Sequence, residues 1–462
     1  MSNIKLVVSL ILILCTLTGC TKEPTESYST DAEMEPETIS RGSVTSYYVS
    51  PRGDDNGPGT IDHPWATIQH AADTMAAGDT LFLREGVYNQ TTVTENSGSQ
   101  SDGYITFTAY PGEIPVLDGT GVSESQNGFI IRNNYIKLSG LEIQNWDENG
   151  IWIENSHHFE ISDCKVHDVF YGIGVADGSH DFVLNRVEMY DFDLYGFDAS
   201  ASGGNPNYNG TINDSSAHSG RDRAQNVDGF ALGHGDQHGF VFNRCSAFDV
   251  FDGFDISARD TTINQCIAQE NWNAGFKFWS DDASLINSLS YHNEVTNVEL
   301  DWDGIPGITT IFNCTLVESG TFNIWIENQD DSLHMYNSIL AGGHLNGLTF
   351  EQISVTNYEG DYNIFHNNNE ERAMVVGYEV EFSLEQIIDG EWSNYSEQDK
   401  HSIVVENAES LFENLNMWDL HLRPDSIAID AGTHDGAPDM DFDGIIRPQG
   451  PGVDIGAFEF SN

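Results

Sequence analysis

The chain has 462 residues, and its 18 Lys and Arg against 73 Asp and Glu give a formal net charge of −55. A charge this negative excludes nucleic acid and anionic membrane surfaces as partners of the folded protein. Hydrophobic residues make up 39% of the sequence, which is enough for an extended core. Glycine and asparagine are frequent and helical periodicity is scarce, so we expect β-structure with many tight turns.

The N-terminal residues have the pattern of an export signal. Residues 6–17 form an apolar run that is too short to span a membrane. Leu17-Thr18-Gly19-Cys20 resembles a lipobox, so we predict a signal peptide over residues 1–20 with a lipid on Cys20; an ordinary secretory signal is the alternative. Residues 21–45, with Ser, Thr, Glu and Pro, are predicted to form a flexible tether. We therefore expect a secreted protein or a cell-surface lipoprotein, attached to the membrane only through Cys20.

One helix is predicted near the start of the folded region. Pro64 suits a first helical turn, and the apolar residues from Ile68 to Met75 fall on one face of a helix over residues 64–75. Strand-like segments at residues 47–50 and 80–83 flank it. We expect this helix to cap one end of an otherwise all-β fold.

From residue 127 onward a short repeat recurs, and each copy is marked by a glycine. The residues one and three places after the glycine are apolar in every copy, whereas the residue between them varies, which indicates one strand with alternating inward and outward side chains. The steps between the markers are 22, 22, 24, 33, 24 and 22 residues. A strand that recurs at this interval indicates a parallel β-helix, and the step is too short for a propeller. The markers are Gly128, Gly150, Gly172, Gly196, Gly229, Gly253 and Gly275.

We predict that this solenoid extends over residues 46–345, with Phe230, Phe254 and Phe276 in one interior column. Residues 346–462 are predicted to form an irregular excursion and a C-terminal closing segment. The body of the chain contains four cysteines whose spacing fits no zinc site, so a buried column of small residues is expected, with a disulfide between neighbours as the alternative. These cysteines are Cys164, Cys245, Cys266 and Cys314.

Three aspartates and a lysine are expected to converge on adjacent coils. Asp228 and Asp252 both directly precede a marker glycine, Asp255 follows Asp252 on the same coil, and Lys277 lies beyond Asp255 in the outward column. Neighbouring strands lie about 4.8 Å apart, so these carboxylates would repel one another unless a cation joined them, and such an oxygen cluster suits Ca²⁺. The alternative is that the aspartates are ordinary turn residues of an acidic chain and that Lys277 pairs with Asp255 at the surface.

Arginines near this cluster are candidates for holding an acidic ligand on a protein that would otherwise repel it. Arg223 and Arg259, with Arg221 beside them, lie near the aspartates in sequence. Simple solvation or salt bridges to neighbouring aspartates would account for each of them equally well.

The motifs around the cluster resemble those of a known family. Asn226-Val227-Asp228-Gly229-Phe230, Asp252-Gly253-Phe254-Asp255 and Gly275-Phe276-Lys277 are similar to the core motifs of polysaccharide lyase family 9, across roughly residues 45–345. The resemblance implies a right-handed parallel β-helix in which Lys277 is the Brønsted base and Asp228, Asp252 and Asp255 bind Ca²⁺. One feature departs from the pattern, because Phe251 stands where the family has a further aspartate, and Asp249 is the candidate to replace it.

The expected function is that of a monomeric, Ca²⁺-dependent lyase that cleaves pectate or polygalacturonate by β-elimination, so the expected partner is an acidic polysaccharide. A rhamnogalacturonan lyase, an alginate lyase and a uronate epimerase are alternatives with similar chemistry. A non-catalytic β-helix that only binds glycans at the cell surface is the alternative of another class, although a binding protein has no need of Lys277 as a base. Glycosidases instead use a pair of carboxyl groups and no lysine.

Overall fold

The structure, a computed structural model, describes residues 44–122, 127–200, 204–279, 282–301, 307–327, 332–351, 355–369, 371–377 and 380–461. The predicted signal peptide, Cys20 and nearly all of the predicted tether lie outside these residues. All described residues belong to one unit, residues 42–462. Within them, no helix is both long and apolar enough to cross a membrane.

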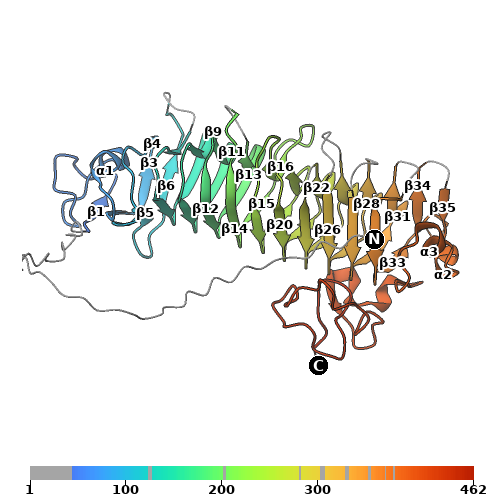
Figure 1. Cartoon of the computed structure of the whole chain (residues 1–462). Helices are drawn as coiled ribbons and strands as arrows, with labels where there is room; N and C mark the ends of the chain where they lie inside the picture. Colours follow the sequence, from blue (N-terminus) through green and yellow to red (C-terminus); the bar gives the residue numbers. More distant parts are fainter. Residues whose placement is uncertain are drawn as a thin grey trace, which may run out of the picture. The chain divides into compact units, whose positions relative to one another are not determined.

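The described chain forms a parallel β-helix, as the repeat predicted, and its coils follow one another in sequence order (Figure 1). Each coil adds one strand to a sheet of thirteen parallel strands. This sheet contains, in order, β1 (Ser46–Val49), β2 (Thr80–Leu83), β5 (Ile105–Ala109), β8 (Ile136–Ser139), β10 (Glu160–Ser162), β12 (His180–Asn185), β14 (Tyr208–Asn213), β17 (Val241–Asn243), β20 (Thr261–Asn264), β23 (Ala283–Ile286), β26 (Ile308–Phe312), β29 (Ser332–Tyr336) and β32 (Tyr358–Asp361).

Two further parallel ladders complete the coils. They are joined where the long strands β9 (Glu142–Glu154), β11 (Lys165–Ala176) and β13 (Glu188–Ala199) run through both. The second ladder also contains β3 (Gly86–Tyr88), β6 (Pro115–Asp118), β15 (Ser216–His218), β18 (Ser246–Phe248), β21 (Ile267–Gln269), β24 (Leu289–Tyr291), β27 (Thr315–Val317), β30 (Ile339–Gly343), β33 (Ile364–Asn367) and β36 (Ile403–Val404). The third contains β4 (Thr92–Val93), β7 (Phe129–Ile131), β16 (Asp228–Leu232), β19 (Phe254–Ile256), β22 (Ala274–Phe278), β25 (Thr296–Leu300), β28 (Phe322–Ile326), β31 (Asn346–Phe350) and β34 (Met374–Val376).

The interior of the third ladder has the predicted register. Phe230 pairs with Phe254 and Phe254 with Phe276, and the rings stack with centroids 4.9 Å apart in both steps. All three rings are fully buried. The alternation predicted from the glycine markers is therefore confirmed, and it fixes which side chains of these strands face outward.

A sharp corner separates the second ladder from the third. One residue per coil adopts a left-handed backbone there, as Asp249 (φ 54°), Glu270 (φ 55°) and His292 (φ 57°) do. Asp tolerates this conformation better than most residues, whereas Glu is a less usual choice. The corner turns the chain immediately before the third ladder, in which Phe254 faces the core and Asp255 faces outward.

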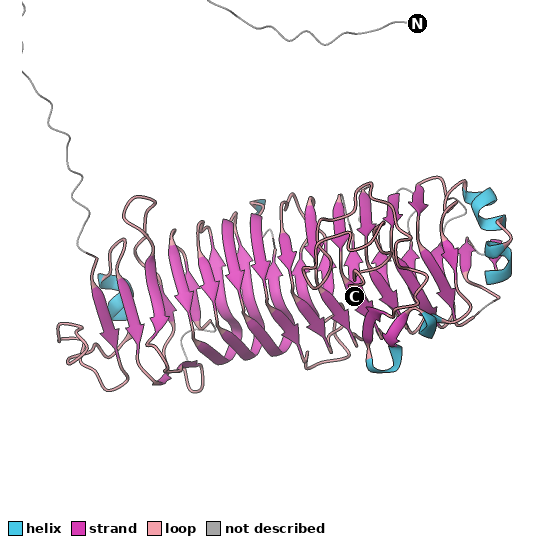
Figure 2. Cartoon of the chain, turned by 90° about the horizontal axis from the view of Figure 1, so that it is seen from below, coloured by secondary structure: helices cyan, strands magenta, loops and turns pink. Residues whose placement is uncertain are grey.

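Helices cover both ends of the stack (Figure 2). The predicted N-terminal helix is α1 (Ile68–Thr74), which begins later than residue 64 because Thr67 caps it by accepting a hydrogen bond from the His70 backbone N–H. Its residues Ile68, Ala71 and Ala72 are buried. At the other end, β35 (Val380–Phe382) pairs antiparallel with β34, and α2 (Leu384–Ile388) and α3 (Glu391–Ser396) follow.

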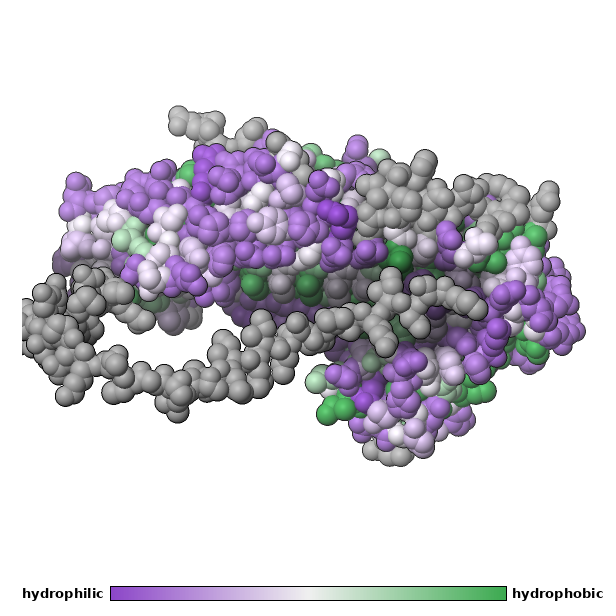
Figure 3. Space-filling model, in the orientation of Figure 1, coloured by the Kyte–Doolittle hydropathy of each residue, from purple (hydrophilic) through white to green (hydrophobic). Residues whose placement is uncertain are grey.

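The stack continues beyond residue 345, through β31, β33, β34 and β36. The last segment then packs on the outer side of the second ladder, in the region of β24 to β33 (Figure 1). It contains η2 (Ala408–Ser410), β37 (Phe412–Asn414), η3 (Leu415–Met417) and β38 (Asp419–Leu422). Hydrophilic residues predominate on the face drawn in Figure 3, as the net charge leads one to expect.

The four cysteines of the body are buried and free, which confirms the predicted buried column over the disulfide. Cys245 and Cys266 occupy neighbouring coils, where the backbone N–H of Cys245 donates to Sγ of Cys266 at 3.3 Å.

Candidate active site

The three predicted aspartates form one cluster. Asp228 opens β16, Asp252 precedes β19 by two residues, and Asp255 is the outward residue of β19. One carboxylate oxygen from each lies within 4.8 Å of the others. Asp228 is 0% exposed and Asp252 only 1%, while Asp255 is half-buried. Three carboxylates are thus held together with little access to water.

Neighbouring groups fix the orientation of these carboxylates. Oδ2 of Asp228 accepts a hydrogen bond from the Asn226 side-chain amide at 2.9 Å, and its Oδ1 accepts one from the Asp252 backbone N–H at 3.2 Å. Oδ1 of Asp252 accepts from the Asn273 side chain at 2.8 Å and from the Ala274 backbone at 2.9 Å. Among the residues that the structure describes, the hydrogen-bond donors to Asp252 all contact Oδ1, which leaves Oδ2 for another ligand.

The electrostatics of the cluster favour a cation. Burial, followed by the charge of Asp255, raises the pKa of Asp228 well above its usual range. The same two causes raise the pKa of Asp252, and burial raises that of Asp255. A hard divalent cation bound by oxygen ligands would offset the repulsion that the three ionised groups otherwise experience. The donor set therefore fits a metal such as Ca²⁺.

These shifts predict a pH-dependent effect of calcium on stability. Because the carboxyls hold protons more tightly in the folded chain, the metal-free protein loses stability as the pH rises above about 3.9, the usual aspartate value. Bound calcium would remove this loss, so we expect it to raise Tm more at about pH 8 than at about pH 5. Scanning calorimetry with and without Ca²⁺ measures the difference. Asp255→Asn should show a weaker pH dependence, and an equal calcium effect at both pH values would contradict the expectation.

Lys277 lies beside the cluster but does not pair with Asp255. The strand register places it opposite Asp255, as predicted. Its Nζ instead lies 2.9 Å from Oε1 of Glu299 and 2.8 Å from Oδ2 of Asp301, and its side chain is only 11% exposed. Nζ also lies 4.3 Å from the centroid of the Trp279 ring. The alternative of a surface ion pair with Asp255 is therefore wrong, because Lys277 forms a largely buried ion pair with two other carboxylates.

These carboxylates change the protonation of the lysine. Burial disfavours the charged amine, but the charges and hydrogen bonds of Glu299 and Asp301 outweigh burial and raise the pKa of Lys277 above its usual range. Burial also raises the pKa of Glu299, to about 6, and its Oε2 is buried without a hydrogen-bond partner. These contacts hold the amine as an ammonium ion.

The sequence analysis did not identify Glu299, Asp301 or Trp279 as site residues. A signal for Glu299 was present, because a further step of 22 residues from Gly275 reaches Asn297 and places Glu299 in the outward column. Glu299 indeed pairs with Lys277 in the ladder. Because Asn297 replaces the marker glycine, the repeat is not evident in the sequence at this coil.

The two predicted substrate-binding arginines lie on opposite sides of the third ladder, one before its strand and the other after it. Arg223 precedes β16, and its guanidinium lies 4.7 Å from the Trp272 ring centroid and 3.0 Å from Glu294. Arg259 follows β19 on the turn back to the first sheet, where it forms a 3.7 Å ion pair with Asp236. Arg221 pairs with Asp193 at 2.9 Å.

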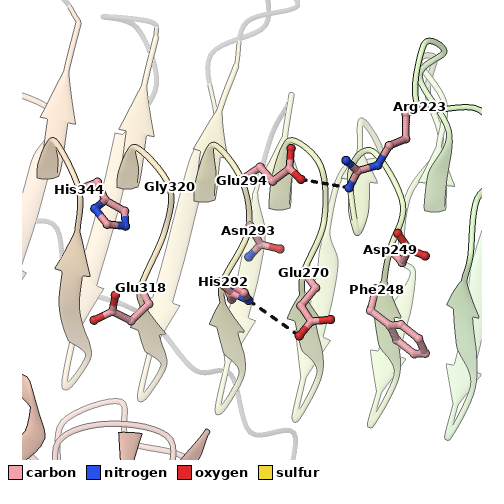
Figure 4. Close-up of a pocket in the computed structure, with 10 residues that line it drawn as sticks. All are labelled: Arg223, Phe248, Asp249, Glu270, His292, Asn293, Glu294, Glu318, Gly320 and His344. Atoms are coloured by element: carbon pink, nitrogen blue, oxygen red, sulfur yellow. Dashed lines mark hydrogen bonds and ion pairs between the residues drawn. The ribbon is translucent and has the colours of Figure 1, made fainter. Parts of the chain in front are cut away.

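Arg223 belongs to a groove along the corner between the second and third ladders (Figure 4). The groove has a volume of about 930 Å³. Its lining residues come from successive coils and are Arg223, Phe248, Asp249, Glu270, His292, Asn293, Glu294, Glu318, Gly320 and His344.

Asp249 does not supply the carboxylate that Phe251 lacks. Its Oδ1 accepts a hydrogen bond from the Trp272 indole at 2.9 Å, and it lines the groove rather than joining the aspartates. Phe251 packs against the hydrophobic core. Among the residues that the structure describes, the cluster therefore consists of three carboxylates.

Comparisons with known proteins point to one group. Residues 47–273 match the family model described as Pel9A-like, right handed beta helix region. The chain is 27% identical over 253 residues to pectate lyase PEL9 of Emericella nidulans, which covers 50% of this chain and 58% of that protein. It is 25% identical over 354 residues to pectate lyase L of Paenibacillus polymyxa, which covers 70% of this chain and 71% of that protein.

A solved structure gives the same result for the fold. The crystal structure of pectate lyase Pel9A matches with a TM-score of 0.56 and 17% identity, over 91% of this chain and 98% of that chain. At 17% identity, this match is evidence for the fold only. The match to PEL9 of Emericella nidulans spans little more than half of that relative's length.

Proposed function

Residues 47–273 belong to the family of Pel9A-like right-handed β-helix regions, as the motifs around Asp228 and Lys277 predicted, and from this membership we propose that the protein is a Ca²⁺-dependent polysaccharide lyase. Its proposed substrate is pectate or polygalacturonate, which the names of the two pectate lyase relatives support. The observation that carries the proposal is the convergence of three buried aspartates with Lys277 in the adjacent outward position.

The proposed reaction is β-elimination at a uronate residue. The neutral amine of Lys277 takes the proton from C5, the electrons of the C5–H bond form the C4–C5 double bond, and the glycosidic oxygen leaves from C4 and takes up a proton. Asp228, Asp252 and Asp255 would hold the metal through their carboxylate oxygens. A calcium ion bound there would supply positive charge that stabilises the developing carbanion and lowers the pKa of the nearby amine.

Glu299 and Asp301 would restrain the lysine between turnovers. Their contacts at 2.9 and 2.8 Å hold Nζ in place, at the cost of keeping it protonated. The amine must release that proton before it acts as a base, so free amine is scarce near neutral pH. This arrangement favours an enzyme that works best in alkaline solution.

A chelator-controlled assay tests the proposal directly. Wild-type protein incubated with polygalacturonate should generate the unsaturated C4–C5 product, which absorbs in the ultraviolet, and a chelator should abolish the signal until Ca²⁺ is restored. Rhamnogalacturonan and alginate in parallel identify the polymer. Binding to these glycans without any unsaturated product would favour the non-catalytic alternative.

We also propose that the protein is exported and acts as a monomer, either secreted or anchored through a lipid on Cys20. The apolar run of residues 6–17 and the lipobox-like tetrapeptide that ends at Cys20 support this location. Mass spectrometry of the mature N-terminus distinguishes a lipidated Cys20 from an ordinary signal cleavage.

A further inference from the structure

One side chain contacts both parts of the proposed active site. Trp279 directly follows β22, and its backbone N–H donates to the Ile256 carbonyl at 2.9 Å, which fixes its position on the coil. Its indole Nε1 donates to Oδ1 of Asp255 at 2.5 Å. The face of the same ring lies under Nζ of Lys277, 4.3 Å from the centroid.

These two contacts constrain different groups. The indole N–H donates to Oδ1 of Asp255 and so restrains the rotation of a carboxylate that belongs to the aspartate cluster. The ring face attracts the ammonium of Lys277, whose four-carbon stem is otherwise flexible. The ammonium is therefore confined between an aromatic face and the carboxylates of Glu299 and Asp301.

The chain repeats this arrangement at a second tryptophan. The indole of Trp272 donates to Asp249 at 2.9 Å, and the Arg223 guanidinium lies 4.7 Å from its ring centroid. Asp249, however, lies outside the aspartate cluster. Trp272 therefore provides an internal control, because its side chain makes the same two kinds of contact with Asp249 and Arg223, which are not part of the cluster.

We propose that Trp279 is a positioning residue that couples the metal site to the base, because one rigid ring system sets both the orientation of Asp255 and the location of the Lys277 amine. This inference rests on the proposed function for its catalytic meaning. The coupling itself is a physical property of the resting protein and is measured without substrate.

Calcium titration tests the first contact. Trp279→Phe keeps an aromatic ring beneath Lys277 and removes only the N–H donor to Asp255. A hydrogen bond to a charged group is a substantial interaction, so Ca²⁺ affinity measured by calorimetry should fall about tenfold or more in this variant. Trp272→Phe should bind Ca²⁺ as the wild type does. Equal affinity in Trp279→Phe and wild type would overturn the first half of the proposal.

Chemical reactivity of the amine tests the second contact. Wild-type protein and Trp279→Leu are treated with an amine-acylating reagent, and modification at Lys277 is quantified by mass spectrometry against Lys165, whose side chain is 57% exposed. Removal of the ring should raise the relative reactivity of Lys277 several-fold, whereas Trp272→Leu should leave it unchanged. Unchanged reactivity in a Trp279→Leu protein of wild-type secondary structure would overturn the second half.

Kinetics separate this inference from the proposed function. If the coupling operates in catalysis, Trp279→Leu, which removes the ring beneath Lys277, lowers kcat at saturating Ca²⁺ with little change in KM. A wild type that cleaves no polyuronate would refute the lyase proposal, yet the titration and the acylation experiment would still decide the coupling. A normal kcat in a variant with altered Ca²⁺ affinity would show that the coupling has no catalytic role.

Discussion

Lys277→Arg is expected to fold, to bind Ca²⁺ and polymer as the wild type does, and to lose nearly all turnover. Arginine retains the positive charge that Glu299 and Asp301 hold, but a guanidinium does not deprotonate at any usable pH. General-base catalysis is typically worth about 10²–10⁴-fold, so kcat should fall by at least that factor. Continuous ultraviolet detection of the unsaturated product measures the loss.

The pH profile of the wild type gives an independent check on the same residue. The neighbouring carboxylates raise the pKa of Lys277, so the fraction of free amine grows as the pH rises and kcat should rise toward alkaline pH. Lys165→Arg is the matched control, because Lys165 also pairs with a glutamate, Glu188 at 2.7 Å, on a distant coil. Appreciable lyase activity in Lys277→Arg would assign the base elsewhere.

Asp252→Asn is expected to weaken calcium binding by an order of magnitude or more. Asp252 is fully enclosed, and within the described part of the chain only its Oδ1 accepts hydrogen bonds, so the substitution removes a charged oxygen from the three-carboxylate cluster. The amide also resembles the carboxylate in size, which limits structural damage. Calorimetric titration with Ca²⁺ measures the change, and lyase activity should fall in parallel at limiting Ca²⁺.

Asp249→Asn is the control for this prediction. Asp249 lies three positions earlier on the same coil and accepts a hydrogen bond from the Trp272 indole, but it lines the groove and does not belong to the cluster. Its variant should titrate as the wild type does. A wild-type calcium isotherm in Asp252→Asn, or an equal loss in both variants, would show that the assigned ligands are wrong.

The sequence was sufficient to predict the stacking of the coils because the repeat contains its own register. Once the glycine markers align, Phe230, Phe254 and Phe276 must share an interior column, and Asp255 must lie opposite Lys277 on the outside. The aspartate cluster then follows from strand spacing alone. These are backbone properties, which depend on the period of the pattern and hardly on individual side-chain conformations.

The partners of Lys277 could not be predicted in the same way. At the next coil Asn297 replaces the marker glycine, so the sequence repeat loses its marker there although the ladder continues. Asp301 and Trp279 follow their strands and lie outside the repeating columns. Their contacts with Lys277 depend on how a long side chain bends over the ladder, and a periodic pattern does not determine this.

The loss of the marker glycine at two successive coils, where Asn297 and Asn323 stand in its place, explains the predicted limit at residue 345. The marker returns at Gly347, and Leu348 after it pairs with Ile324 on the preceding coil and Met374 on the next, so the coil geometry persists beyond that limit. Apolar residues at the inward positions are enough to continue the stack.

The C-terminal segment has a consequence for how the stack opens. Coils of a solenoid contact only their neighbours, so such proteins tend to fray from an end, coil by coil. Here Phe412, Ile455 and Phe458 form one apolar cluster with residues of several successive coils, from Leu289 on β24 to Ile364 on β33. Each of these coils therefore packs against the C-terminal segment as well as against its neighbouring coils. For one of them to open, the C-terminal segment must first detach from the whole group. The coil that contains Glu299 is one of them. The carboxylate that restrains Lys277 therefore lies on a coil that does not unfold independently of the C-terminal segment.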